Sequence, residues 1–411
     1  MAANTEVDDG KTGCDDLRSE MIAGTSTPPR IAFLFNAQRH HILHGGTSAA
    51  ALARGWDADV RIMAPSRDHL AYARLLAERY AASPLAFEEA GWPLLNRLSA
   101  RTGRAVPPKF ATLLTAWPAL AKCDAIILPE RTTTILRRWG MRRPHLIHID
   151  HGAGDRAAGF DPRIALFDFV LMAGEKHRRR LLAEKLVRPG HYAVAGYPKF
   201  EAADLMRVPG VRIFADDRPI ILYNPHFSTD LGSWHRFGSD IVTAIAESGR
   251  YNLIVAPHVR LCDRADRRAA VLSRLAHLRN NPHVHIDLGS ERCVDMSYIE
   301  LADLYLGDVS SQVYEFLRKP RPCLFVNPSG HRWEGDPNYA HWAFGPVIDR
   351  PGAIVASLDE AFASHDRFLG AQLRGFAETF DLRPDQGSSQ RVAAAIAAYL
   401  GLRPRDPVIT P

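Results

Sequence analysis

The stretch LYLGDVSSQVYEFL, residues 304–317, contains the transition that decides the fold. An apolar run is followed by Asp308, two adjacent serines (Ser310 and Ser311) and then an amphipathic run. This pattern is typical of a buried strand that passes through a tight turn into a helix. The first N–H groups of a helix have no partner inside it, and serine hydroxyls can cap them or join them in holding a phosphate. Taken alone, the stretch favours serines that only cap the helix.

The same alternation of apolar strand and amphipathic helix recurs along the chain. The predicted strands lie at 30–37, 57–65, 123–130, 145–152, 168–174 and 191–198, and in a second series at 219–227, 251–259, 283–289, 302–308 and 321–328. Helical patterns lie between them, as at 67–83 and 176–188. Short apolar strands that alternate with helices predict parallel sheets covered on both faces. We therefore predict an α/β protein with two tandem Rossmann-like domains and a cleft between them.

The domain limits follow from shifts in composition. Residues 1–29 are polar, acidic and rich in Gly, Ser, Thr and Pro, and we expect a disordered leader there. The first domain is predicted at 30–205 and the second at 206–385, joined by a linker within 202–219. The last helical pattern, at 388–401, follows the end of the second sheet. We expect the segment 386–411 to contain a helix that crosses back onto the first domain.

Composition excludes several classes of protein. The 411 residues are 46% hydrophobic and 24% charged, an ordinary globular balance, and the sequence has no uncharged apolar run long enough to span a membrane. The first residues have no apolar core, so we expect a cytoplasmic protein. The net charge is +5, with arginines clustered at 177–180 and 264–279. These clusters are read as solvated helix faces or, alternatively, as surfaces for an anionic substrate or the inner face of the cytoplasmic membrane. No nucleic-acid-binding pattern is present.

The chemistry is expected at strand ends. In open parallel sheets, ligands bind beyond the carboxyl ends of the strands. Polar residues follow several predicted strands here: His151 and Gly152, Lys199, His226, His258, Asp308, Ser310 and Ser311. Among these, a histidine that titrates near neutrality can take a proton from an attacking hydroxyl, which suits His151. A neutral imidazole N–H at His258 can bond a phosphoryl oxygen.

Other residues have less direct roles. Asp308 is a candidate to orient the loop or to bond an acceptor hydroxyl, and Glu315, one helical turn beyond Ser311, to reach ribose hydroxyls. Gly45 and Gly46 end the stretch RHHILHGG, which we interpret as a turn that opens the first helix next to the cleft. Its histidines also allow a zinc site as the less favoured interpretation. We expect no metal and no cofactor, and no P-loop, GxSxG or GxGxxG occurs in its required context.

Five short motifs in one order resemble the CDP-glycerol glycerophosphotransferase family, the teichoic-acid-type polymerases and primases of the GT-B superfamily. They are DHGAG at 150–154, GYPKF at 196–200, ILYNPHF at 221–227, APHVR at 256–260 and GDVSS at 307–311. The resemblance runs from about residue 145 to 400 and includes the last helix. Three features depart from the family pattern. Val309 replaces an aromatic residue, Pro257-His258 reverses the usual order, and His226 replaces a threonine.

The resemblance implies a transferase that moves a glycerophosphate or a sugar from a CDP- or UDP-activated donor to a cell-envelope glycan or lipid acceptor. It implies that the second domain holds the donor and the first the acceptor. It also implies His151 as the base, His258 as a phosphate contact, and Ser310 and Ser311 at the donor phosphates. Two alternatives remain. A nucleotide-sugar 2-epimerase shares the plan but needs extra carboxylates, for which Asp155 and Glu175 are the candidates. A nucleotide-sugar-binding scaffold without activity is the other.

Overall fold

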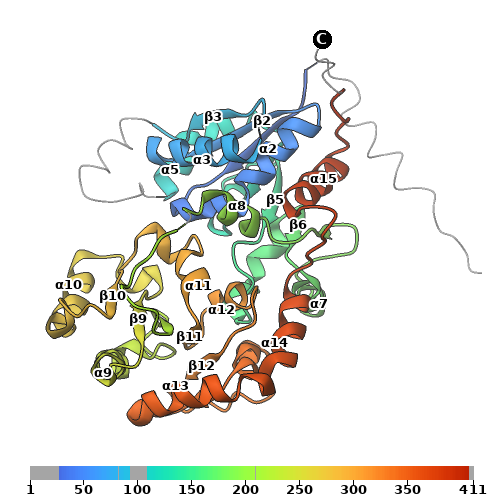
Figure 1. The fold of residues 1–411 in the computed structure, drawn as a ribbon. Helices are drawn as coiled ribbons and strands as arrows, with labels where there is room; N and C mark the ends of the chain where they lie inside the picture. The colour runs from blue at the N-terminus through green and yellow to red at the C-terminus, as the bar shows by residue number, and fades with distance from the viewer. Residues whose placement is uncertain (1–26, 82, 93–108, 209, 407–411) are drawn as a thin grey trace, which may run out of the picture.

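The computed structural model describes residues 27–81, 83–92, 109–208 and 210–406, and shows two α/β domains with helices packed around each sheet (Figure 1). The predicted leader, residues 1–29, lies almost wholly outside the described part. None of the described helices is long and apolar enough to span a membrane.

The first domain is built on a parallel sheet of seven described strands in the order β3-β2-β1-β4-β5-β6-β7. Its strands are β1 (Arg30–Leu34), β2 (Asp59–Ala64), β3 (Ala86–Glu89), β4 (Ala125–Leu128), β5 (His145–Ile149), β6 (Phe169–Met172) and β7 (Tyr192–Val194). Its α-helices are α2 (Gly46–Gly55), α3 (Arg67–Tyr80), α5 (Lys109–Leu120), α6 (Ile135–Arg138), α7 (Glu175–Ala183) and α8 (Lys199–Met206). Its 3-10 helices are η1 (Arg39–His44), η2 (Thr132–Thr134), η3 (Ala157–Gly159) and η4 (Pro162–Leu166).

The second domain has a parallel sheet of six described strands in the order β10-β9-β8-β11-β12-β13. Its strands are β8 (Ile220–Asn224), β9 (Asn252–Val255), β10 (Val284–Ile286), β11 (Leu304–Gly307), β12 (Cys323–Val326) and β13 (Val347–Ile348). Its α-helices are α9 (Trp234–Ser248), α10 (Ala265–Arg274), α11 (Ser297–Leu301), α12 (Gln312–Phe316), α13 (Ile354–Ala363) and α14 (His365–Thr379). Its 3-10 helices are η5 (Val259–Leu261), η6 (Ala276–Leu278), η7 (Glu291–Cys293), η8 (Pro337–Phe344) and η9 (Pro351–Ala353).

Helices cover both faces of each sheet, as the apolar strands predict. Successive side chains of a strand point to opposite faces. In β1, Ile31 and Phe33 pack into one buried cluster, while Ala32 and Leu34 pack into another on the opposite face. All four side chains are fully buried. A strand with four consecutive apolar residues therefore belongs in the middle of a doubly covered parallel sheet, and β1 lies there.

The strand order creates one switch point in each sheet. In the first, the chain runs outward from β1 through β2 and then returns to place β4 on the other side of β1. In the second, β9 and β11 flank β8 in the same way. Loops diverge above such a point, so that a crevice opens at the carboxyl ends of the two central strands. This topology makes the loops after β1, β4, β8 and β11 the natural place for a ligand.

The last helix, α15 (Ser388–Leu400), crosses back to the first domain, as the sequence predicts. It packs along α2 and adds Val392 and Ile396 to the core of the first sheet (Figure 1). The crossing begins earlier than residue 386, because α14 already contacts α7 and the N–H of Asp381 donates to the carbonyl of Ala173 at 2.9 Å. The second domain is thus tied to the first at both of its ends.

Three features differ from the sequence prediction. Strand β3 was not expected, because its four residues are all half-buried and two of them are glutamates. Strand β13 has two residues and gives no apolar run. The predicted linker at 202–219 begins inside α8, whose residues Ala202 and Ala203 are buried, so the linker proper starts after Met206.

Candidate functional site

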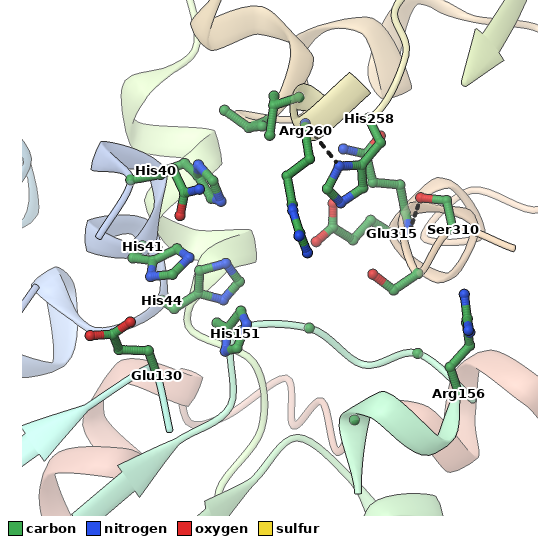
Figure 2. Close-up of a pocket in the computed structure, with 18 of the residues that line it drawn as sticks. His40, His41, His44, Glu130, His151, Arg156, His258, Arg260, Ser310 and Glu315 are labelled. Atoms are coloured by element: carbon green, nitrogen blue, oxygen red, sulfur yellow. Dashed lines mark hydrogen bonds between the residues drawn. The ribbon is translucent and has the colours of Figure 1, made fainter. Parts of the chain in front are cut away.

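A cleft with a volume of about 680 Å³ lies between the two domains. The first domain contributes side chains from the loops after β1, β4 and β5, and the second from the loops after β8, β9 and β11. Figure 2 shows His40, His41, His44 and His151 on one side, with His258, Arg260, Ser310 and Glu315 opposite. The two switch points of the sheets therefore face each other across one cleft.

His151 stands at the carboxyl end of β5 on the wall formed by the first domain. Burial lowers the pKa of His151 below its usual value of about 6.5, and Arg131 lowers it further, whereas the carboxylate of Asp150 opposes the shift. The Asp150 carboxylate itself lies 3.0 Å from Nδ1 of His177. His151 is consequently neutral at pH 7 and able to accept a proton.

Two histidines of the opposite wall are hydrogen-bond donors. The Nδ1 atom of His258 accepts the N–H of Arg260, and Nδ1 of His226 accepts the N–H of Ser228, each at 3.2 Å. Burial lowers the pKa of His258 to about 4 and that of His226 to about 3, so both rings are neutral. A neutral imidazole that accepts at Nδ1 carries its proton at Nε2. Both rings therefore offer an Nε2–H group to an anion in the cleft.

Ser310 and Ser311 form the turn before α12, as the opening stretch predicts. The Oγ atom of Ser310 accepts the N–H of Gln312, the first residue of α12, at 3.3 Å, while Ser311 is the N-cap residue and its side chain accepts none of the helix N–H groups. The Oγ of Ser311 has no hydrogen bond among the described residues, and Ser311 is exposed in the cleft. Helix α12 has five residues, so local hydroxyl and N–H groups contribute more here than a helix dipole. Ser311 is the member of the pair left available to a ligand.

The glycines after His151 allow the two domains to approach closely. A Cβ atom at Gly154 would lie 2.9 Å from Cβ of Ser311, and one at Gly152 would lie 3.5 Å from Oγ of Ser311. Any side chain at position 154 would push α12 away from the loop after β5. The loop that carries the candidate base is thus held against the loop that carries the serines.

Three predicted site residues do not line the cleft. Asp308 is fully buried, and its carboxylate accepts the N–H groups of His226 at 2.8 Å and Ser233 at 2.7 Å. Asp308 thereby joins the loops after β8 and β11 and has no access to a substrate. The catalytic role predicted for Asp308 is corrected to one of positioning these loops. Gly45 and Gly46 face the core of the first domain, where a Cβ at Gly46 would lie 2.9 Å from Leu76. They begin α2 as expected but do not contact the cleft.

Lys199 and Glu315 do line the cleft, and the structure pairs them across the domain boundary. The ammonium of Lys199 lies 2.7 and 2.8 Å from the two oxygens of Glu315, and the hydroxyl of Tyr197 donates to the same carboxylate at 2.8 Å. Lys199 and Glu315 are each about 95% buried. The Oε2 atom of Glu315 accepts from Lys199 alone, which leaves it capacity for a ribose hydroxyl.

A second buried network holds the domains together and was not anticipated from the sequence. Asp155, which follows His151 in the same loop, accepts the hydroxyl of Tyr314 at 2.7 Å, the ring of His341 at 2.8 Å and the ammonium of Lys176 at 3.0 Å. Tyr314 and His341 belong to the second domain. These partners leave the pKa of Asp155 well below its usual range, despite the opposing effect of burial. The loop after β5 is anchored from both domains.

The charges of the cleft favour an anion. Its three carboxylates are neutralised by lysines: Glu130 by Lys109, Asp155 by Lys176 and Glu315 by Lys199. The guanidinium groups of Arg156 and Arg260 also line the cleft and form no ion pair with the described residues; that of Arg260 stacks 4.1 Å from the ring centre of Phe227. Cations without carboxylate partners in a recessed site attract phosphate groups. No group of three or more metal-ligating side chains in the described residues has the geometry of a metal site.

Comparison with proteins of known structure identifies the fold. No family model and no curated protein matches the sequence. Among solved structures, the wall teichoic acid polymerase TagF matches with a TM-score of 0.58 at 13% identity, over 91% of this chain and 89% of that chain. The S. aureus MnaA structure with UDP matches with a TM-score of 0.60 at 13% identity, over 91% and 97% of the two chains.

A UDP-GlcNAc 2-epimerase from Neisseria meningitidis, bound to UDP-GlcNAc, matches with a TM-score of 0.56 at 13% identity, over 90% of this chain and 99% of that chain. These likenesses cover both domains, and the two parallel sheets of the described residues have the plan of those structures. This chain is therefore an α/β protein of the GT-B fold.

Proposed function

We propose that the protein is a transferase that moves a glycerophosphate or a glycosyl group from a CDP- or UDP-activated donor to a cell-envelope glycan or lipid acceptor. One observation carries the proposal. A neutral histidine at the end of β5 faces, across one cleft, a wall of N–H, hydroxyl and guanidinium donors. A proton acceptor opposite a group of anion-binding donors is an arrangement suited to transfer from a nucleoside diphosphate donor.

In the glycerophosphate version, an acceptor hydroxyl attacks the distal phosphorus of the donor. Its proton passes to His151, a new O–P bond forms, and the bond between that phosphorus and the bridging oxygen of CMP breaks, so that CMP leaves with the electron pair. Negative charge grows on the phosphoryl oxygens and on the leaving group. The Nε2–H groups of His226 and His258, the hydroxyl of Ser311 and the guanidinium of Arg260 are placed to offset this charge without a metal ion.

In the glycosyl version, the hydroxyl attacks the anomeric carbon, the bond from that carbon to the donor phosphate breaks, and the nucleoside diphosphate leaves. The same donors then hold the departing diphosphate. Both versions need donors that bind a diphosphate, so the same wall suits either reaction. The acceptor proton passes to His151 in both.

A nucleotide-sugar 2-epimerase is the weaker alternative on this structure. The two carboxylates that the sequence offers for it are not placed for proton abstraction from a substrate. Asp155 is 3% exposed and occupied by Tyr314, His341 and Lys176. Glu175 begins α7, pairs with Arg178 and lies outside the cleft.

The deciding experiment compares donors with and without an acceptor. The purified protein is incubated with CDP-glycerol and with a panel of CDP- and UDP-sugars, with a lipid-linked envelope acceptor or none, in buffer containing EDTA. We expect nucleotide release that depends on the acceptor and persists in EDTA. Epimer formation from UDP-N-acetylglucosamine without acceptor would establish the epimerase instead. Donor binding with no turnover across the whole panel would establish the scaffold.

Arg260 provides a prediction about donor binding. We expect the Arg260→Ala variant to bind nucleotide diphosphate donors about ten- to hundredfold more weakly, because a charge-assisted contact contributes about 1.5–3 kcal/mol. The measurement is the rise in Tm on titration with CDP, UDP and their conjugates, since ligand that binds the folded state raises stability by mass action. Arg264→Ala is the matched control, because that arginine is exposed, pairs with Asp266 and lies outside the cleft. Equal shifts in both variants would remove Arg260 from the donor site.

The acid limb of the pH profile tests the base. His151 accepts a proton only when it is neutral, and burial holds its pKa below the usual value of about 6.5. The logarithm of kcat/KM is therefore expected to stay level as the pH falls through 6.5 and to decline only at lower pH. Asp150→Asn removes a charge that raises this pKa, and should move the decline to still lower pH. A decline centred above pH 6.5, or one that moves upward in this variant, would contradict the assignment.

A further inference from the structure

Two histidines on the first-domain wall each have a buried ring nitrogen without a hydrogen-bond partner. His41 and His44 are 6% and 2% exposed and line the cleft, yet the Nδ1 atom of each bonds to none of the described residues. Buried polar side chains in folded proteins are nearly always hydrogen-bonded. His69 on the neighbouring helix α3 shows this rule. It is 4% exposed, with one ring nitrogen 2.7 Å from Oγ of Ser66 and the other 3.0 Å from the carbonyl of Ala37.

The local structure turns both rings the same way. His41 and His44 belong to η1, the 3-10 turn that follows β1 at the switch point. Residues three apart eclipse each other in a 3-10 helix, so the two side chains leave the turn on one side. The ring of His41 lies 4.9 Å from that of His151, and the ring of His44 lies 6.4 Å from it, measured between ring centres. Figure 2 shows these rings gathered on one side of the cleft.

We propose that His41 and His44, with His151, form a subsite for neighbouring hydroxyl groups at the polyol end of the acceptor. The inference rests on the proposed function and adds to it the acceptor chemistry and two binding residues. A polyol with hydroxyls on adjacent carbons is compact enough to meet two rings of this cluster at once. The hydroxyl nearest His151 loses its proton on attack, while His41 and His44 hold its neighbour and so fix the orientation of the attacking oxygen.

The ring chemistry selects hydroxyls over phosphate. A neutral imidazole has one donor and one acceptor, which matches a hydroxyl, whereas a phosphate only accepts. Burial lowers the pKa of both rings well below the usual value. The charges that face the cluster act in the same direction, since Lys109 lies near His41, Lys199 lies near His44, and His40 and His151 adjoin both. An anion is better served by the opposite wall, where Arg260 and the Nε2–H groups of His226 and His258 lie.

The first test separates binding from folding. In His44→Leu and His41→Leu, an apolar side chain of similar size replaces a largely buried ring whose Nδ1 atom has no hydrogen-bond partner among the described residues. We expect the acceptor KM to rise at least tenfold, the donor KM to stay unchanged, and the Tm to stay equal or rise. His69→Leu is the matched control and removes two formed hydrogen bonds, so its Tm should fall while the acceptor KM stays unchanged. A fall in Tm with an unchanged acceptor KM, or a rise in donor KM, for the cleft variants would overturn the proposal.

The second test does not depend on turnover. The intact protein is titrated with glycerol, with propane-1,3-diol and with inorganic phosphate, while the imidazole nitrogens are followed by NMR and assigned from the variants. Glycerol should shift the signals of His41 and His44, the 1,3-diol should shift them at least tenfold less at equal concentration, and phosphate should leave them neutral. Phosphate-induced protonation, or no response to glycerol, would overturn the subsite. If glycerol binds but no donor is turned over, the subsite stands and the proposed transfer fails.

Discussion

Replacement of His151 by alanine is expected to lower kcat for group transfer by about 10²- to 10⁴-fold, the usual contribution of a general base. The ring ends β5 within the cleft and is neutral, and in our mechanism it removes the acceptor proton as the new bond forms. Donor affinity should change little, since the donor is held by the opposite wall. The measurements are steady-state transfer rates and the donor-induced rise in Tm.

His145→Ala is the control for this variant. His145 begins the same strand, lies outside the cleft and bonds to the hydroxyl of Tyr399. Its loss is expected to lower Tm and to leave kcat within about twofold of the starting enzyme, far less than the loss of a general base. Undiminished turnover in His151→Ala would rule out His151 as the base, whatever the donor proves to be.

Replacement of Asp155 by alanine is expected to lower the free energy of unfolding by about 3–5 kcal/mol, the cost of removing one partner of a buried charge pair. Asp155 is 3% exposed, and the change would leave the half-buried ammonium of Lys176 without its ion-pair partner. It would also remove the acceptor for Tyr314 and His341, two of the contacts that tie the second domain to the loop after β5. Denaturant unfolding followed by tryptophan fluorescence measures the loss.

The same carboxylate predicts the direction of acid sensitivity. The pKa of Asp155 is depressed in the folded state, so its contribution to stability is present above its unfolded value of about 3.9 and is lost as the pH falls through the folded pKa. The starting protein should therefore lose stability on acidification below pH 4 more steeply than Asp155→Asn. Asp266→Ala is the control, because that carboxylate is exposed and pairs with an exposed arginine. If Asp155→Ala unfolded at the same denaturant concentration as this control, Asp155 would not anchor the domains.

The residues at the strand ends could be predicted because the strands themselves are recognisable as apolar runs in the sequence. Runs such as those of β1, β5 and β11 are apolar at most positions and do not alternate with polar residues, which indicates burial on both faces and therefore a parallel sheet. Once the sheets are parallel, the residues after their strands must share an edge. That reasoning predicts His151, His258 and Ser311 in one cleft, and the structure brings them together there. The roles assigned to them remain predictions.

Residues whose roles depend on contacts between loops were harder to assign. Asp308 follows a strand just as Ser310 does, yet its side chain turns inward to the N–H groups of His226 and Ser233. Lys199 and Glu315 were expected to face a substrate, and they bind each other. A strand-end position gives the edge of the sheet on which a residue lies but not the direction of its side chain, because that direction depends on the neighbouring loops.

Local pattern was sufficient for the two tandem sheets, the returning last helix and the polar residues at the strand ends, because the periodicity of apolar residues is written in consecutive positions. The network around Asp155 and the position of His41 and His44 at the wall of the cleft depend on which strands lie side by side and on how the two sheets meet. Asp155 and His341 are 186 positions apart in sequence but 2.8 Å apart between their bonded atoms. Contacts over such separations form only when the domains dock, and the docking buries the charges and rings that give the cleft its chemistry.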